Sequence, residues 1–178
     1  STTAGMLAFL MQRLGVEPNY IGGGRVKQFR DNRNPGNALT GTSELLVIEA
    51  CESDGTIVSY HPLYSIIANL DLDHNPVEKT AEMFETLSRN TKEEVIINGD
   101  DKYLKKYHFE KTVSFSLDTV SEYQAVAIDY QPFYTTFTLR GVKFHLSLPG
   151  KYNLYNALSF LTLLSETGTT FEDISVVL

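Results

Sequence analysis

The chain has 178 residues, of which 42% are hydrophobic, and a formal net charge of −7 at pH 7. This length and apolar content suit one packed core and exclude an intrinsically disordered chain. The longest apolar runs fall far below the roughly 20 residues that a bilayer-spanning helix needs, so we expect no contact with a membrane. The acidic charge and scattered Lys and Arg residues argue against a nucleic-acid partner, for which a basic stripe is typical. The single cysteine, Cys51, excludes an internal disulfide and fits a cytoplasmic protein.

The first half of the chain predicts helices that alternate with short buried strands. Apolar residues at helical spacing predict an amphipathic helix over residues 2–14, and a Gly-, Pro- and Asn-rich loop with one short strand at 19–21 follows. Continuous apolar runs, typical of buried parallel strands, occupy residues 43–50, 64–71 and 93–99, and a second helical pattern covers 77–90. This order predicts the α/β class, with a doubly wound, mostly parallel sheet and helices on both faces.

The second half is rich in β-type sequence before it returns to helix. Segments 111–117, 124–131 and 133–150 favour strands, and the last alternates around Arg140-Gly141 as an antiparallel hairpin does. We therefore expect a small antiparallel sheet beside the parallel one. Residues 153–166 predict a helix, and a further helical pattern begins at residue 171.

Three hydroxyl residues, Ser1, Thr2 and Thr3, open the first predicted helix. In one interpretation they form an N-cap and first turn, where hydroxyls satisfy free backbone N–H groups. In the other they are the end of a phosphate-binding loop of the pattern G-x-x-G-K-[ST]-T. The hydroxyls by themselves leave both interpretations open.

Acidic and imidazole side chains follow two of the predicted strands. Glu49 comes at the end of one strand, and His74 follows the next. In an open α/β sheet ligands gather beyond the carboxyl ends of parallel strands, so these side chains are expected at one edge, close enough to share a metal ion. The alternative is that the acids are solvated strand ends and His74 caps a helix. Other polar residues in the two segments are Glu52, Asp54, Asn69, Asp71 and Asp73.

Two amides lie one turn apart at the start of a predicted helix. Asn153 and Asn156 are either an N-cap followed by a surface amide or a pair that faces a ligand. The glycines at 22–24 lack the spacing of a nucleotide-binding motif and favour a turn.

These motifs resemble the central, ATP-binding domain of the Mur ligases, which add amino acids to the UDP-muramyl precursor of peptidoglycan. The similar stretches are STT, EPNYIGG, LLVIEACESDG, HPLYSIIANLDLDH, VIINGDD and LPGKYNLYNAL. The ESDG stretch and the strand that ends in N-x-x-x-DH are most similar to the branch that adds L-alanine to UDP-N-acetylmuramate. Sister ligases carry a carbamylated lysine where this chain has Ser88, which favours the same branch or the related murein-peptide-recycling ligase.

The resemblance implies a role for each candidate residue. Ser1, Glu49 and His74 would stand where Mg²⁺ ligands sit, the last two as catalytic residues. Ser1 and Thr2 would end the phosphate loop around ATP, and Asn153 and Asn156 would lie near the nucleotide. The enzyme would activate a substrate carboxylate as an acyl phosphate, which the amine of an amino acid then attacks.

The resemblance also implies a domain organisation. Residues 1–178 would be a central domain truncated at both ends, without the N-terminal UDP-binding domain and the C-terminal domain. The UDP-sugar and the amino acid would bind the full-length enzyme, and we expect the segment alone to be inactive. Departures from the pattern are Cys51, Asn75-Pro76 and Tyr152. They leave open another ligase of the superfamily, of the recycling or folylpolyglutamate type, or a non-catalytic domain that keeps the fold.

Overall fold

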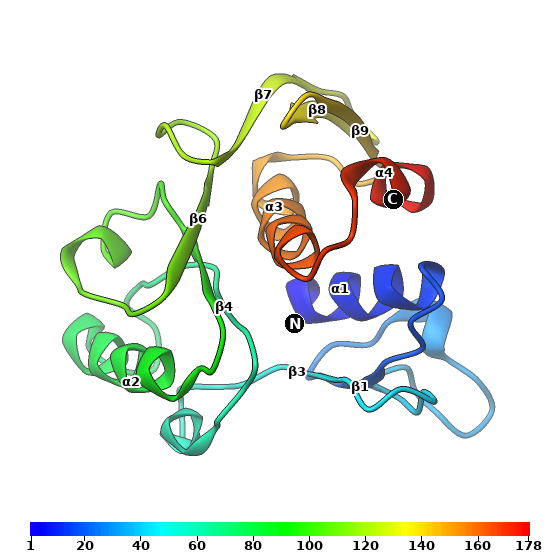
Figure 1. Cartoon of the computed structure of the whole chain (residues 1–178). Helices are drawn as coiled ribbons and strands as arrows, with labels where there is room; N and C mark the ends of the chain where they lie inside the picture. The colour runs from blue at the N-terminus through cyan, green and yellow to red at the C-terminus, as the bar shows by residue number, and fades with distance from the viewer.

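The structure is a computed structural model that describes residues 1–178 (Figure 1). The α-helices are α1 (Thr2–Arg13), α2 (Val77–Asn90), α3 (Lys151–Glu166) and α4 (Phe171–Val177). The strands are β1 (Asn19–Ile21), β2 (Ala38–Leu39), β3 (Leu46–Ile48), β4 (Ser65–Ile67), β5 (Val95–Asn98), β6 (Thr112–Ser116), β7 (Tyr123–Tyr130), β8 (Thr135–Leu139) and β9 (Val142–Leu146). Short 3₁₀ helices are η1 (Lys27–Phe29), η2 (Thr56–Ser59) and η3 (Leu104–Lys106). None of the helices combines the length and the apolar character needed to span a bilayer.

The larger sheet has the strand order β4-β5-β6-β7-β8-β9. Its strands β4 to β7 are parallel, whereas β7, β8 and β9 pair antiparallel. The predicted hairpin turns at Arg140 and Gly141, whose φ angles of 46° and 85° are those of a two-residue hairpin turn. The α/β class and the antiparallel addition are therefore confirmed, and β7 joins the two parts into one continuous sheet.

Helices cover both faces of the parallel strands because successive side chains of a strand point to opposite sides. In β5, Ile96 belongs to the core that α3 covers, whereas its neighbour Val95 belongs to the core that α2 covers. Figure 1 shows α2 and α3 on opposite sides of β4 and β6. The predicted doubly wound arrangement is confirmed.

Strand β3, which ends immediately before Glu49, lies in a second, smaller sheet of order β2-β1-β3. The expectation that β3 is a fully buried strand in the same sheet as β4 is wrong, because β3 pairs only with β1 and leaves Leu46 53% and Ile48 39% exposed. Only Val47, between them, packs against the core.

Helix α1 connects the two sheets. Leu7 and Leu10 join the large core that α3 also lines, while Ala8 packs with Tyr20 and Phe29 next to the small sheet. Ser1, the N-cap residue of α1, consequently lies near the end of β3, where the candidate site begins.

Candidate functional site

Glu49 is bound at the end of β3 by groups from two other segments. The Ser1 hydroxyl donates a hydrogen bond of 2.8 Å to Glu49 Oε1, and the Gly23 N–H donates one of 2.6 Å to Oε2. Ser1 occupies the N-cap position of α1, but its side chain makes no capping hydrogen bond. The capping interpretation is therefore wrong for this hydroxyl, which faces the carboxylate.

Glycines allow the loop after β1 to approach this pair. A Cβ atom on Gly23 would lie 3.2 Å from Glu49 Oε2 and 3.4 Å from Ser1 Oγ, and one on Gly24 would lie 2.9 Å from Ser1 Cβ. A larger residue at either position would push the loop away from Ser1 and Glu49. The sequence predicts only a turn here, because close approach between distant segments leaves no local signal.

The local environment of Glu49 acts on its pKa in two opposite directions. Partial burial raises the pKa of Glu49, whereas hydrogen bonds from the Gly23 N–H and the Ser1 hydroxyl lower it. Glu49 is therefore ionised at neutral pH and presents a carboxylate beside a hydroxyl oxygen. Such hard oxygen donors are the ligands that Mg²⁺ prefers.

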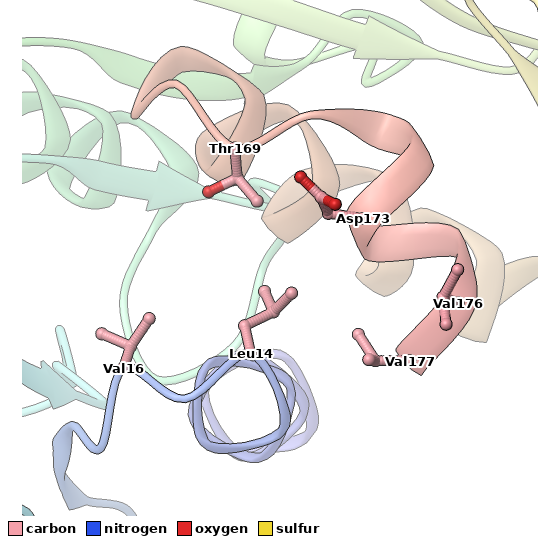
Figure 2. A pocket seen from close by; sticks show the side chains of 6 residues that line it. All are labelled: Leu14, Val16, Thr169, Asp173, Val176 and Val177. Atoms are coloured by element: carbon pink, nitrogen blue, oxygen red, sulfur yellow. The ribbon is translucent and has the colours of Figure 1, made fainter.

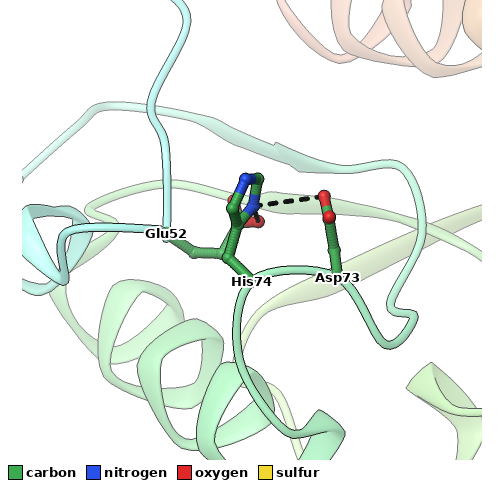
Figure 3. A group of neighbouring side chains, drawn as sticks. All are labelled: Glu52, Asp73 and His74. Atoms are coloured by element: carbon green, nitrogen blue, oxygen red, sulfur yellow. Dashed lines mark ion pairs between the residues drawn. The ribbon is translucent and has the colours of Figure 1, made fainter.

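His74 lies in a second cluster, on the loop after β4 (Figure 3). Its Nδ1 atom is 3.3 Å from Asp73 Oδ2 and 4.0 Å from Glu52 Oε1, and one ligand atom of each residue lies within 4.8 Å of the others. The Asn75 side chain donates a 3.3 Å hydrogen bond to the Glu52 carbonyl. The loops after β3 and β4 thus meet at Glu52.

The predicted sharing of one metal ion by Glu49 and His74 stays a prediction, although the sheet arrangement differs from the expected one. The two residues follow strands of different sheets, and the carboxylates beside His74 are those of Asp73 and Glu52. The alternative that His74 caps a helix is wrong, since α2 has Pro76 at its N-cap and no side-chain cap. Sequence reasoning places Glu52 among the polar strand ends but gives it no role. The metal-ligand roles of Ser1, Glu49 and His74 stay predictions.

The two amides of α3 have different partners. Asn153 donates a 2.8 Å hydrogen bond to the Pro149 carbonyl, whereas Asn156 Oδ1 accepts one of 2.9 Å from the Thr3 hydroxyl. Neither caps α3, whose N-cap is Gly150 without a side-chain cap. Asn156 is thus brought to the first turn of α1, and Asn153 is engaged locally.

A cavity of about 450 Å³ opens beside the start of α1. Ser1 and the exposed Thr2 line it together with the basic residues Arg25 and Lys27. The sequence does not single out these two cations, because their segment reads only as loop. Another cavity, of about 440 Å³, lies past the other end of α1 and is lined by none of the candidate residues (Figure 2).

Comparisons with known proteins identify the family of the chain. A family model described as the Mur ligase middle domain matches residues 2–164. A UDP-N-acetylmuramate–L-alanine ligase from Nostoc punctiforme is 32% identical, with 96% of this chain and 36% of the relative covered. A crystal structure of UDP-N-acetylmuramate-alanine ligase from Thermotoga maritima has a TM-score of 0.86 at 24% identity, covering 100% of this chain and 41% of that one.

A MurF ligase from Thermotoga maritima, solved in complex with ADP, has the same fold. Its TM-score is 0.63 at 17% identity, with 98% of this chain and 45% of that one covered. The chain therefore spans less than half the length of each of these relatives. Because the middle-domain model covers most of the residues, the predicted resemblance is confirmed and the chain belongs to the Mur ligase family.

Proposed function

We propose that this chain is the nucleotide-binding centre of a longer cytoplasmic ligase that uses ATP to add L-alanine to UDP-N-acetylmuramate. The observation that carries the proposal is the Ser1–Glu49–Gly23 cluster at the start of α1, in a chain of this family. The names of the relatives support the choice of substrates. Since the chain spans 36% of the Nostoc relative, the proposal gives the UDP-sugar and alanine contacts to other parts of the longer protein.

The donor set suits Mg²⁺ with ATP. Ser1 Oγ and the ionised Glu49 carboxylate offer adjacent hard oxygens, and the missing side chains at Gly23 and Gly24 leave the loop close beside them. In this proposal Ser1 and Glu49 would hold the metal, with His74 as a ligand from the neighbouring loop. When bound, Mg-ATP would supply the phosphoryl group that activates the substrate carboxylate as an acyl phosphate.

The remaining residues would bind and orient the nucleotide. The first N–H groups of a helix have no partner within it and point toward an anion at the N-terminus, so Ser1 and Thr2 are well placed for phosphate. Arg25 and Lys27 add positive charge to the same cavity of an otherwise acidic chain. Asn156, already bonded to Thr3, would bring an amide to the same end of α1.

Glu49→Ala in the longer protein tests this proposal, with Glu44→Ala as the matched control. Glu44 precedes β3 and Glu49 follows it, so each variant removes one carboxylate from an opposite end of the same strand. ADP release is measured with UDP-N-acetylmuramate and L-alanine at saturating Mg²⁺. We expect Glu49→Ala to lower kcat by about 100-fold, because metal stabilisation of transition-state charge is worth several kcal/mol, and Glu44→Ala to keep normal turnover.

Normal turnover of Glu49→Ala would contradict the metal role. ADP release that requires a peptide in place of L-alanine would instead identify a recycling ligase. No ADP release by the wild type with any amino acid would favour a non-catalytic domain.

A further inference from the structure

We propose that Asp100 and Asp101 are positioning residues that fix the two sides of the candidate nucleotide site, Asp100 through the first turns of α3 and Asp101 through the segment that leads to His74. This inference rests on the proposed function, which it deepens. Neither residue has a role in the site described above, although both belong to the motif VIINGDD.

Both residues follow β5, which pairs with β4 on one side and β6 on the other. The Asp100 N–H donates a 3.0 Å hydrogen bond to Asn98 Oδ1, which fixes the turn after the strand. The two neighbouring side chains contact different segments. Asp100 accepts a hydrogen bond from the loop after β6, and Asp101 accepts one from the loop after β4.

The Asp100 carboxylate accepts four hydrogen bonds from two other segments. Oδ2 accepts the N–H groups of Leu117 at 2.6 Å and Asp118 at 3.0 Å, and Oδ1 accepts that of Thr119 at 2.7 Å. The fourth comes from the Tyr155 hydroxyl of α3, 2.9 Å from Oδ2. Charge-assisted hydrogen bonds of this kind are roughly twice as strong as neutral ones.

The protonation state of Asp100 supports this role. Burial raises the pKa of Asp100, but hydrogen bonds from Thr119, Leu117 and Asp118 outweigh it, so the pKa lies well below its ordinary value. Asp100 is consequently a charged acceptor throughout the neutral range.

Tyr155 connects the Asp100 carboxylate with the part of α3 that lies at the candidate site. Tyr155 immediately precedes Asn156, whose side-chain oxygen accepts a hydrogen bond from Thr3. The position of α3 along its axis and its rotation about that axis at Tyr155 therefore decide where the Asn156 amide lies. The other polar link between α3 and the loop after β6 is the ion pair of Lys151 and Asp118, with side chains 51% and 72% exposed. Exposed pairs of this kind contribute little, so the Tyr155–Asp100 hydrogen bond is the stronger polar attachment, in addition to the apolar packing of α3 on the core.

Asp101 accepts a hydrogen bond on the other side of the candidate site, from the segment that leads to His74. Its Oδ2 atom accepts the Leu70 N–H at 3.2 Å, and its Oδ1 atom accepts the N–H groups of Tyr103 and Leu104 at 2.8 Å each. Leu70 is 1% exposed and lies between β4 and His74 in the chain. Asp101 therefore anchors the start of the segment that carries the predicted metal ligand.

Tyr155→Phe in the longer protein tests the role of Asp100, with Tyr123→Phe as the matched control. The Tyr123 hydroxyl donates to Glu166, so each variant removes one hydroxyl-to-carboxylate hydrogen bond of α3, at opposite ends of the helix. The dissociation constant of Mg-ATP is measured by calorimetry and thermal stability by melting. We expect Tyr155→Phe to weaken nucleotide binding about tenfold, as loss of an outer-shell partner does, and Tyr123→Phe to leave it unchanged.

Further variants test the roles of Asp100 and Asp101 separately. Asp100→Asn combined with Tyr155→Phe should weaken binding no more than Asp100→Asn alone, because both remove the same link. Asp101→Asn should raise the Mg²⁺ concentration needed for half-maximal turnover, while Asp31→Asn, which alters a carboxylate that accepts two backbone N–H groups in an exposed loop, should not. If Asp100→Asn does not fold, Tyr155→Phe still tests the positioning role of Asp100, because this variant removes only one hydroxyl group.

The outcomes distinguish this inference from the proposed function. Wild-type protein that does not bind Mg-ATP would overturn both. Wild-type protein that binds Mg-ATP, with Tyr155→Phe and Tyr123→Phe equal to it in affinity, would overturn the positioning role alone. Equal weakening by both tyrosine variants would show a general effect of helix stability and would also overturn it.

Discussion

Tyr20 carries a buried hydroxyl that has no hydrogen-bond partner, and we predict that Tyr20→Phe stabilises the protein. The side chain is 1% exposed, and its ring packs edge-on against Phe29 with the centroids 5.6 Å apart. The substitution keeps this packing and removes only the hydroxyl. Burial and the nearby Glu49 charge raise the pKa of Tyr20, so the group that is lost is neutral.

The expected gain follows from the cost of an unsatisfied polar group. A buried donor or acceptor without a partner costs about 1–3 kcal/mol, and this cost disappears in the phenylalanine variant. For a domain of this size each 1 kcal/mol corresponds to about 2–4 °C in Tm. At the lower limit we therefore expect Tm to rise by about 2–4 °C.

Thermal and urea unfolding of wild type and Tyr20→Phe measure this difference. An unchanged urea m value would show that the change lies in native-state stability and not in the compactness of the unfolded chain. A Tyr20→Phe variant less stable than wild type would refute the reasoning, because it would show that the hydroxyl has a partner such as a buried water molecule.

Two further predictions concern a close backbone contact and a partly buried acid. Gly41→Ala should destabilise the protein by about 1–3 kcal/mol in urea unfolding, as overpacking does, because its Cβ would lie 1.9 Å from the Glu17 carbonyl oxygen; stability equal to wild type would show that the Glu17 backbone shifts freely. Burial, followed by the charge of Glu166, raises the pKa of Glu94. The folded state thus holds this proton more tightly than the unfolded state, and ionisation of Glu94 costs stability as pH rises above the ordinary glutamate pKa. Glu94→Gln should therefore raise Tm at pH 7 and have no effect near pH 4; an equal gain at both pH values would contradict this cause.

Comparison of the Tyr155, Glu49 and Glu94 variants also separates effects on nucleotide binding from effects on protein stability. Glu49 lies at the candidate site, whereas Glu94 immediately precedes β5 and is expected to affect stability without affecting nucleotide binding. Loss of affinity in Tyr155→Phe without loss of stability would point to position, and not folding, as the property that Asp100 controls.

Local patterns in the sequence determined most of the elements. Helix α2 spans the predicted residues 77–90, and the strand at 19–21 and the hairpin turn at Arg140-Gly141 also occur as expected. Periodicity and turn residues act over a few neighbouring positions, so they are visible in a sequence without tertiary information. The motifs that resemble Mur ligases likewise predict that Ser1 and Glu49 share one metal site; the two side chains form a hydrogen bond, and their metal roles stay predictions.

Only the tertiary structure decided which distant groups meet. An apolar run predicts a strand but not its partner, and β3 paired with β1 in a separate sheet instead of joining β4. In consequence His74 faces Glu52, while Glu49 faces Ser1 and Gly23. The linking role of Asp100 depends on loops and helices far away in the chain, whose approach is fixed by packing of the whole core and not by any residue near the aspartate.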